Sequence, residues 1–336
     1  MHTARVARAL AVLLLAACSS DRLTNIAKTP SAPQGEITEG GLLLNHAGSP
    51  ATNLTVAAIN DSGIVAGSLT DGSPQVATTW APPIYNPTTL PLPGDTGTSL
   101  GTRVSNDGTV LGKTCDSLGQ HCRWVTWKNG TITPITPQGD ARDICPCDGQ
   151  VIVGGLMVDG VQHPVIWTHG KVFDAGVPSG FTSAEFTAVD EGFMAGTAES
   201  KTAVVPFRWS PQFGFQMLPT SGNAIDVNSS GTVLVDDNNV YPLGGSPIAI
   251  PSDLSKGALS MATALNDSGV VAGIFMFQGD DALPPPSAGE WKIGTAFALP
   301  RGPEGSQALD INNAGFEIGV GFVGPGGTIE TEGWVF

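Results

Sequence analysis

Short apolar stretches separated by turn residues run through the whole sequence. In one of them, Asn60-Asp61-Ser62-Gly63 favours a tight turn, and Ile64-Val65-Ala66 follows it as a strand. The flanking residues are β-branched or small, which suits strands packed on both faces. Glycine (44) and proline (26) make up about a fifth of the 336 residues and interrupt helices every few positions. The pattern therefore predicts an all-β protein made of short strands.

The same turn recurs seven times at nearly equal spacing. Its glycine is found at Gly63, Gly108, Gly149, Gly192, Gly231, Gly269 and Gly315, so the intervals are 45, 41, 43, 39, 38 and 46 residues. A second glycine follows in six copies, and Val235 takes its place in the fifth. An aromatic residue comes later in each copy: Trp80, Trp127, Trp167, Trp209, Tyr241, Trp291 and Trp334. Each period of about 42 residues holds four short strands, here called a to d, which is the size of a β-propeller blade.

The two ends of the chain complement each other. The seventh copy ends at Trp334-Val335-Phe336, after its third strand, and Leu42-Leu43-Leu44 aligns with the fourth-strand stretch Val172-Phe173-Asp174. We therefore expect residues 41 to 47 to complete the last blade and to cover its edge strand. The predicted fold is an all-β, seven-bladed β-propeller of four-stranded blades over residues 41–336, closed by the N-terminal strand in the last blade.

The N-terminus carries a targeting signal. Arg5 and Arg8 precede the apolar run 9–17, which is too short to span a bilayer as a helix. The junction Leu15-Ala16-Ala17-Cys18 resembles the lipobox of bacterial lipoproteins. This resemblance implies a signal peptide over 1–17, lipidation of Cys18, a flexible tether over 18–40 and, because Ser19 follows the cysteine, the outer membrane. An ordinary signal peptide before a chance cysteine is the alternative.

The charge of the chain excludes some partners. The net charge is −15, and without residues 1–17 the chain has 13 basic against 30 acidic residues. Such a surface repels nucleic acid and anionic membranes, so we expect membrane contact through the lipid anchor alone. Solubility is the simplest reading of the charge, although cationic partners and divalent metals are also permitted.

The repeat resembles a known family. Ala-x-x-Asn-x-x-Gly-x-Val-x-Gly, followed by Trp-x-x-Gly, is similar to the HAF extracellular repeat family of bacteria over about 290 residues. The His-Ala-Phe tripeptide itself is absent, and His163-Pro164-Val165 and Val205-Pro206-Phe207 occupy the comparable places. The resemblance implies a secreted or surface protein and transfers no activity or site residue.

Four cysteines remain beyond Cys18. Outside the cytoplasm, an even number of cysteines favours disulfides over thiolate metal sites. They are Cys115, Cys122, Cys145 and Cys147, and three pairings of them are open. A local Cys115–Cys122 bridge is the simplest, but a Cys145–Cys147 bridge would close a tight ring, so cross-pairing between neighbouring repeats is credible. A zinc site from C-x6-C and C-x-C would have unusual spacing.

Propeller topology places the b–c and d–a loops at the same end of the strands, where ligand-binding residues collect. The exceptional loops are Lys113–Arg123 and Gln278–Glu290. The candidate ligand-binding residues in these loops are His121, Asp280 and Asp281. Arg103 and Arg142 are scarce positive charges on or beside innermost strands, where they meet an anionic ligand or pair with neighbouring carboxylates.

No convincing catalytic set is present. Gly97-Thr98-Ser99-Leu100-Gly101 matches the G-x-S-x-G motif of hydrolases, but we expect it in a loop without the helix that the motif requires. No cofactor is expected. Calcium is a weak alternative at Asp236-Asp237 and Asp280-Asp281, which lack EF-hand spacing.

Two functions remain open. The first is a non-catalytic lipoprotein of the cell envelope, a monomer whose propeller binds a protein or glycan through its loop-rich face. The second is a propeller enzyme, a hydrolase or lyase, with a polar site at the channel mouth.

Overall fold

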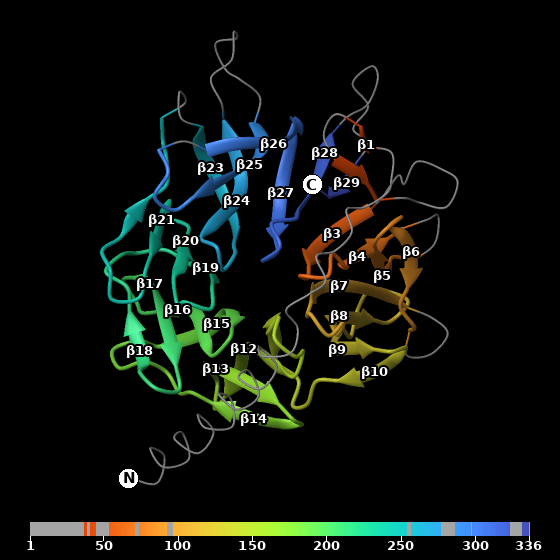
Figure 1. Cartoon of the computed structure of the whole chain (residues 1–336). Helices are drawn as coiled ribbons and strands as arrows, with labels where there is room; N and C mark the ends of the chain where they lie inside the picture. The colour runs from red at the N-terminus through yellow and green to blue at the C-terminus, as the bar shows by residue number, and fades with distance from the viewer. Residues whose placement is uncertain are drawn as a thin grey trace, which may run out of the picture. The chain divides into compact units, whose positions relative to one another are not determined.

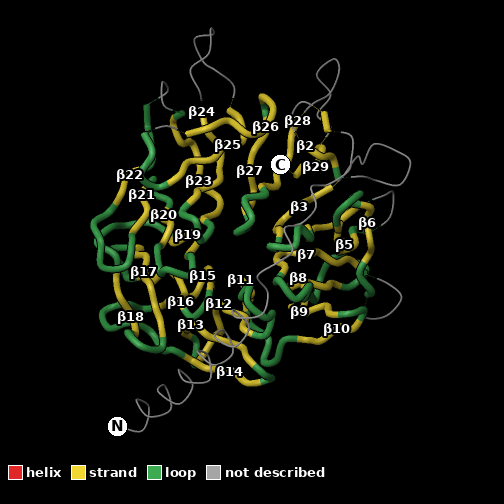
Figure 2. The backbone as a smooth tube through the Cα atoms, in the orientation of Figure 1, coloured by secondary structure: helices red, strands yellow, loops and turns green. Residues whose placement is uncertain are grey.

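The structure is a computed structural model that describes residues 37–38, 41–44, 54–70, 74–92, 97–253, 257–276, 286–296, 298–322 and 331–335. The regular elements in these ranges are all β-strands, as Figure 2 shows. The described residues form two compact units, the first within Thr136–Pro247 and the second within Ala32–Ile135 and Ile248–Phe336.

The first unit contains three antiparallel sheets, and in each the strands lie side by side in sequence order. The first sheet contains β11 (Asp140–Ile144), β12 (Val151–Val158), β13 (Val161–Thr168) and β14 (Lys171–Asp174). The second contains β15 (Ser183–Asp190), β16 (Phe193–Glu199), β17 (Val204–Ser210) and β18 (Gly214–Met217). The third contains β19 (Ala224–Val227), β20 (Val233–Val235), β21 (Asn239–Tyr241) and β22 (Ile248–Ala249), and β22 belongs by sequence to the second unit.

The second unit contains four sheets. One sheet contains β3 (Leu54–Ile59), β4 (Val65–Leu69), β5 (Val76–Ala81) and β6 (Asn86–Thr89), and the next contains β7 (Thr98–Val104), β8 (Val110–Cys115), β9 (Arg123–Lys128) and β10 (Thr131–Pro134). A third contains β23 (Ala258–Leu265), β24 (Val270–Met276), β25 (Pro286–Lys292) and β26 (Ala298–Glu304). The fourth contains, in spatial order, β1 (Ile37–Thr38), β2 (Gly41–Leu43), β29 (Thr331–Val335), β28 (Glu317–Phe322) and β27 (Ser306–Ile311).

These seven sheets are the blades of a seven-bladed β-propeller, as the repeat predicts. Figure 1 shows the neighbouring strands of each blade. The predicted closure is also confirmed, because β2 pairs with β29 through Leu42 opposite Val335 and Leu43 opposite Trp334. The strand ends at Leu43, and residues 45–47 of the predicted closing segment lie outside the described residues. The last blade differs from the repeat in one respect, since β1 pairs with β2 as a fifth strand.

The repeated asparagine explains the a–b turn. Asn60 Oδ1 accepts hydrogen bonds from the backbone amides of Ser62 (3.1 Å) and Ile64 (2.8 Å), so it caps its own turn. Its Nδ2 donates to the carbonyl of Ser105 in the next blade at 2.8 Å. The turn glycine has a positive φ in all seven copies, 78° at Gly63, which an L side chain adopts only with strain.

The second glycine of the repeat is required by close approach of the innermost strand. Each innermost strand carries a β-bulge at the equivalent place, in β3 between Val56 and Ala58. A Cβ added at Gly67 would lie 2.0 Å from the carbonyl oxygen of Thr55. The same clash with the innermost strand would occur at Gly112, Gly154, Gly196, Gly273 and Gly319. This glycine is therefore a packing requirement of the blade.

The aromatic residue of each copy belongs to the blade core. The six tryptophans of the repeat are at most 6% exposed, and Tyr241 is also 6% exposed. Burial of a large aromatic surface is the main apolar contribution of each blade. These residues are therefore part of the blade core and not an exposed stacking platform.

Candidate functional site

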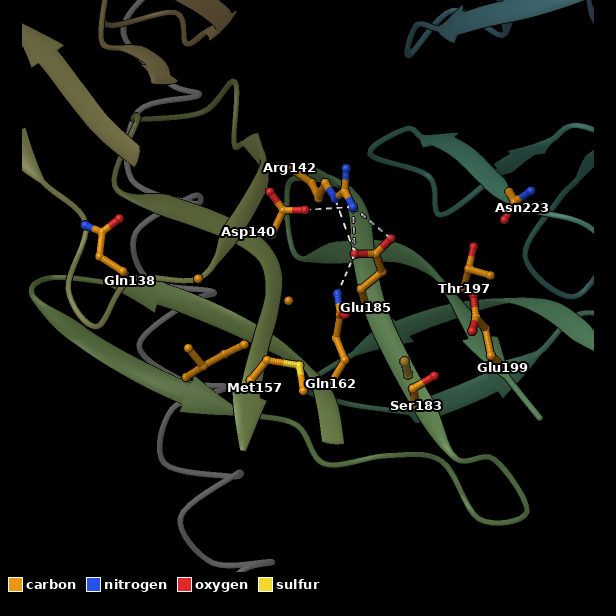
Figure 3. A pocket seen from close by; sticks show the side chains of 14 residues that line it. Gln138, Asp140, Arg142, Met157, Gln162, Ser183, Glu185, Thr197, Glu199 and Asn223 are labelled. Atoms are coloured by element: carbon orange, nitrogen blue, oxygen red, sulfur yellow. Dashed lines mark hydrogen bonds and ion pairs between the residues drawn. The ribbon is translucent and has the colours of Figure 1, made fainter. Parts of the chain in front are cut away.

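A pocket of about 420 Å³ lies between the third and fourth blades of the propeller, within the first unit. It lies at the end of the strands where the b–c and d–a loops run, the end at which the sequence predicts ligand-binding residues. Figure 3 shows its lining side chains from close by. The described residues that line it are Gln138, Gly139, Asp140, Arg142, Gly155, Leu156, Met157, Gln162, Ser183, Ala184, Glu185, Thr197, Glu199 and Asn223.

Arg142 is the central charge of the pocket. It occupies the β-bulge of β11, between Ala141 and Asp143, where a residue leaves the regular ladder and its side chain is redirected. Its Nη2 lies 2.8 Å from Asp140 Oδ2 and 3.1 Å from Glu185 Oε2, and its Nε lies 3.3 Å from the same Glu185 oxygen. Arg142 therefore pairs with neighbouring carboxylates, which is one of the two alternatives that the sequence leaves open.

Glu185 is held from a third strand as well. Gln162, on β13, donates from Nε2 to Glu185 Oε2 at 2.8 Å. A Cβ at Gly155 would overlap this Gln162 amide, so the glycine opposite Asp140 leaves the space that the amide fills. Three strands thus fix one carboxylate, and the charged part of the pocket is organised before any ligand arrives.

The neighbouring strands add a polar patch. Ser183 lies directly opposite Glu199, and Glu185 lies opposite Thr197, in the antiparallel pair β15–β16. Alternate residues of a strand face the same side, so these four side chains share one face of the ladder. Thr197 is 6% exposed and accepts a hydrogen bond from the Ala224 amide at 3.2 Å. Glu199 is exposed, and its carboxylate makes no hydrogen bond or ion pair within the described part of the chain.

The pocket is acidic and has one apolar side. It holds three carboxylates, those of Asp140, Glu185 and Glu199, against the single guanidinium of Arg142. Leu156 and Met157 supply the apolar surface, and Met157 is 61% exposed. None of the fourteen described lining residues is a histidine, cysteine or tyrosine. The arrangement therefore offers hydrogen-bond acceptors and negative charge to a ligand.

The other predicted site residues do not line this pocket. Arg103 lies on β7, as expected, and donates from Nη1 to the Thr102 carbonyl at 2.8 Å. His121 lies in the b–c loop of the second blade. Cys18, Asp280 and Asp281 lie outside the described residues.

The loop that carries His121 is a hairpin held by a disulfide and by hydrogen bonds to Asp116. A disulfide joins Cys115 and Cys122 with a Cα–Cα distance of 4.0 Å. Asp116 Oδ1 accepts the amides of Leu118 (3.0 Å) and Gln120 (2.8 Å), and Oδ2 lies 2.7 Å from His121 Nδ1. The hydrogen bond from His121, followed by that from the Gln120 amide, lowers the pKa of the Asp116 carboxyl.

The second disulfide also forms locally. Cys145 and Cys147 are bonded to each other across one proline, with a Cα–Cα distance of 5.3 Å, so the cross-pairing considered from the sequence is wrong. Cys145 takes the place of the repeat asparagine, since its amide donates to the Val151 carbonyl as the Asn60 amide does to Ile64. The turn is two residues longer than that of the first blade, which brings a second cysteine within bonding reach.

Ser99 has a structural role. It lies inside strand β7, not in a loop as the sequence suggested, and it is 2% exposed. Its Oγ accepts the amide of Ala77 at 2.8 Å, and Ser306 does the same for Ala288 at 3.1 Å in another pair of blades. The innermost strand begins before Ser99 because this hydrogen bond joins it to the preceding blade.

Arg208 is a second structural charge. It is 4% exposed, and its Nη2 donates to the carbonyl of Tyr241 in the fifth blade. Burial lowers the pKa of Arg208 to about 10. This arginine links two blades and does not line the pocket.

Of the acidic residues considered for calcium, Asp236 and Asp237 hydrogen-bond protein groups, and Asp280 and Asp281 lie outside the described residues. Asp236 accepts the amide and the side-chain Nδ2 of Asn223, both at 2.8 Å, and Asp237 Oδ2 accepts the hydroxyl of Thr220 at 2.8 Å. Among the described residues, no group of three or more His, Cys, Asp or Glu side chains could hold a metal ion. Within the described ranges, no helix is long and apolar enough to cross a membrane.

The comparisons with known proteins identify the fold alone. A scan against family models gives no match, and a search of curated protein sequences gives none either. Among solved structures, the propeller domain of the trilobed protease from Pyrococcus furiosus is similar over 85% of this chain and 94% of its own length, with 12% identity and a TM-score of 0.57. That domain is described as having an open velcro topology, whereas here β2 pairs with β29.

Two peptidases show the same likeness. Pyrococcus horikoshii acylaminoacyl peptidase matches with 11% identity and a TM-score of 0.56 over 85% of this chain, and puromycin hydrolase with 10% identity and a TM-score of 0.51 over 86%. The matches cover 51% and 53% of those two chains, so this chain spans about half their length. At these identities the likeness shows a propeller scaffold. The resemblance of the repeat to the HAF family stays a prediction.

The sequence indicates Arg142 as a candidate but does not indicate its partners. Arg142 stands out as a rare cation on an innermost strand, whereas Asp140, Gln162 and Glu185 are ordinary polar residues from three strands. A signal for the polar face is present in the sequence, because polar residues alternate on two adjacent strands, at Ser183 and Glu185 and at Thr197 and Glu199. It required the register of β15 against β16, which the sequence does not specify residue by residue.

Proposed function

We propose that this chain is a non-catalytic lipoprotein of the cell envelope whose propeller binds a protein or glycan through the b–c and d–a end of its blades. The pocket around Arg142 supports the proposal most directly. Its charges are fixed by one another and by Gln162, and such fixed polar groups recognise a ligand with little reorganisation. The likeness to propeller domains agrees with a scaffold role.

The lining residues favour binding over catalysis. The hydroxyls of the pocket belong to Ser183 and Thr197, and no described histidine lines the pocket to act as their base. Two carboxylates, Glu185 and Glu199, line the same pocket, and this is the observation that favours the second candidate, a hydrolase of glycosidic bonds. Glu185 is engaged by Arg142 and Gln162, which suits a positioning role better than proton transfer.

A binding screen tests this function. The purified full chain is presented to a glycan array and to a peptide array, alongside Arg142→Ala and Glu185→Ala variants with unchanged thermal unfolding midpoints. The proposal expects ligands that either substitution weakens about tenfold, the equivalent of about 1.4 kcal/mol. Ligands bound equally by all three proteins, or no ligand at all, would contradict it. Mass spectrometry of each bound ligand after incubation reports turnover, and cleavage would establish the enzyme instead.

The lipid anchor has its own test. Cells that express the full chain are labelled with a palmitate analogue, and the protein is recovered from membrane and soluble fractions. Because the lipobox resemblance assigns lipidation to Cys18, the label and the membrane fractionation should both disappear in Cys18→Ser. A labelled Cys18→Ser protein, or an unlabelled parent chain, would remove the lipoprotein assignment.

A further inference from the structure

Two groups in the pocket keep free bonding capacity. Arg142 uses Nε and Nη2 for Asp140 and Glu185, and its Nη1 makes no hydrogen bond within the described part of the chain. The Glu199 carboxylate likewise has no partner among the described residues. A ligand that fits both groups brings a hydrogen-bond acceptor to Arg142 and a positively charged donor to Glu199.

The charges of the lining side chains determine whether the pocket favours a cationic or an anionic ligand. Arg142 already neutralises much of the charge of Asp140 and Glu185, both of which lie within 3.1 Å of its Nη2. Glu199 adds a further negative charge, and the whole chain has a net charge of −15. Opposite charges attract across such a partly enclosed site, and anionic ligands are repelled. The pocket therefore favours a cation.

The apolar side of the pocket favours a cation that carries an apolar stem. Met157 is 61% exposed and lies opposite Gln162 in the β12–β13 pair, beside the charged network (Figure 3). Lysine and arginine side chains combine an apolar stem with a charged tip, and methionine adapts to such a stem. None of the fourteen described lining residues is aromatic, so the pocket offers no ring face on which a sugar or base would stack.

We propose that this pocket binds a lysine or arginine side chain from an exposed basic segment of a partner protein. The ammonium or guanidinium group binds Glu199, the apolar stem lies against Met157, and a backbone carbonyl of the segment accepts from Arg142 Nη1. This inference rests on the proposed binding function and narrows its ligand to a basic polypeptide. Arginine is also among the residues that most often dominate binding energy at interfaces.

Fluorescence anisotropy of the full chain tests the inference. The probes are fluorescein-labelled nine-residue Gly/Ser/Ala peptides with a central Arg or Lys, the same peptides with citrulline or Glu at that position, and a labelled chitosan oligomer. We expect replacement of Arg by citrulline, and separately Glu199→Gln, to weaken binding about tenfold. Glu191→Gln is the matched control, because it removes the same charge from the a–b turn at the opposite end of the fourth blade. It should change the affinity less than twofold.

The outcomes separate this inference from the proposed function. Equal binding of the Arg and citrulline peptides, or no effect of Glu199→Gln, would overturn the basic-segment inference. Tighter binding of chitosan than of any peptide would do the same, since the cation would then come from a glycan. If glycans on the array bind and basic peptides do not, this inference fails and the binding function stands. If neither class binds, both fail.

Discussion

The side chain of Asn312, in the last blade, donates a hydrogen bond from Nδ2 to the backbone carbonyl of Asn60, in the first blade, at 2.7 Å. The two residues are 252 positions apart in the sequence and equivalent in the repeat. Asn266 donates in the same way to the Asn312 carbonyl at 3.0 Å, and Asn60 donates to Ser105 at 2.8 Å. In these three copies the repeat asparagine thus caps its own turn and joins it to the next blade.

Asn312→Ala should destabilise the protein measurably. Asn312 is 4% exposed, so its loss leaves the Phe316 amide without its side-chain partner and the buried Asn60 carbonyl with the Gly63 amide as its remaining donor. We expect a loss of about 2 kcal/mol in the free energy of unfolding, measured by guanidinium titration with tryptophan fluorescence. Asn313→Ala, at the exposed neighbouring position, is the control and should cost well under half as much. Equal effects of the two substitutions would contradict the role assigned to the repeat asparagine.

Gly67→Ala should be more damaging than alanine at a turn glycine. The new Cβ would lie 2.0 Å from the Thr55 carbonyl oxygen, so the innermost strand must move. At Gly130 the φ of 74° is the only obstacle, since no atom lies within 4 Å of the added Cβ. Expected losses in unfolding free energy are about 3 kcal/mol for Gly67→Ala and about 1 kcal/mol for Gly130→Ala. A Gly67→Ala protein as stable as the parent would show that the strands are not this close.

The Cys115–Cys122 disulfide should stabilise a loop and leave the fold intact when removed. It closes a short ring on the surface, and chain-entropy models assign about 2 kcal/mol to a bridge of this span. The Cys115→Ser, Cys122→Ser double variant should therefore unfold at a lower guanidinium concentration with an unchanged circular dichroism spectrum. Peptide mapping of the unreduced parent should recover two local bridges, and a fragment that links Cys115 or Cys122 to Cys145 or Cys147 would refute the assigned pairing.

The titration of Asp116 reports the geometry of the same loop. Its pKa is lowered because the carboxylate accepts hydrogen bonds from His121 and from two backbone amides. A carboxyl with a lowered pKa in the folded state stabilises that state above its ordinary pKa, and this contribution is lost as the pH falls through the lowered value. His121→Ala should raise the pKa of Asp116 toward its ordinary range in a carboxyl-detected NMR titration. His163→Ala, which removes the partner of Asp174, should leave it unchanged.

The sequence predicts the architecture because each blade needs the same residue types at its turn and its β-bulge. Asn60, Gly63 and Gly67 each satisfy a local requirement of the turn or the bulge, so the same residues recur in other blades and reveal the period. The closing strand is also visible, since Leu42 and Leu43 supply what the last copy lacks. Because the same turn and bulge residues recur along the chain, the blade can be predicted from the sequence alone.

The pocket could be predicted only in part because it breaks the repeat. Arg142 takes a bulge position at which other copies carry residues such as Thr102 or Thr187, and its contacts depend on which side chains the neighbouring blade brings to that bulge. The polar face formed with Glu185 follows from the register of β15 and β16. A shift of one residue in that pairing would turn Glu185 away, and no sequence pattern fixes the register that closely.

Hydrogen–deuterium exchange of the full chain, with and without the tightest-binding ligand from the array screen, tests the binding site most directly. We expect slower exchange in residues 138–142, 155–162 and 183–199, the segments that contain thirteen of the fourteen described lining residues, and no such protection in the Glu185→Ala variant. Protection confined to the disulfide loop at residues 113–123, with unchanged exchange around Arg142, would contradict it.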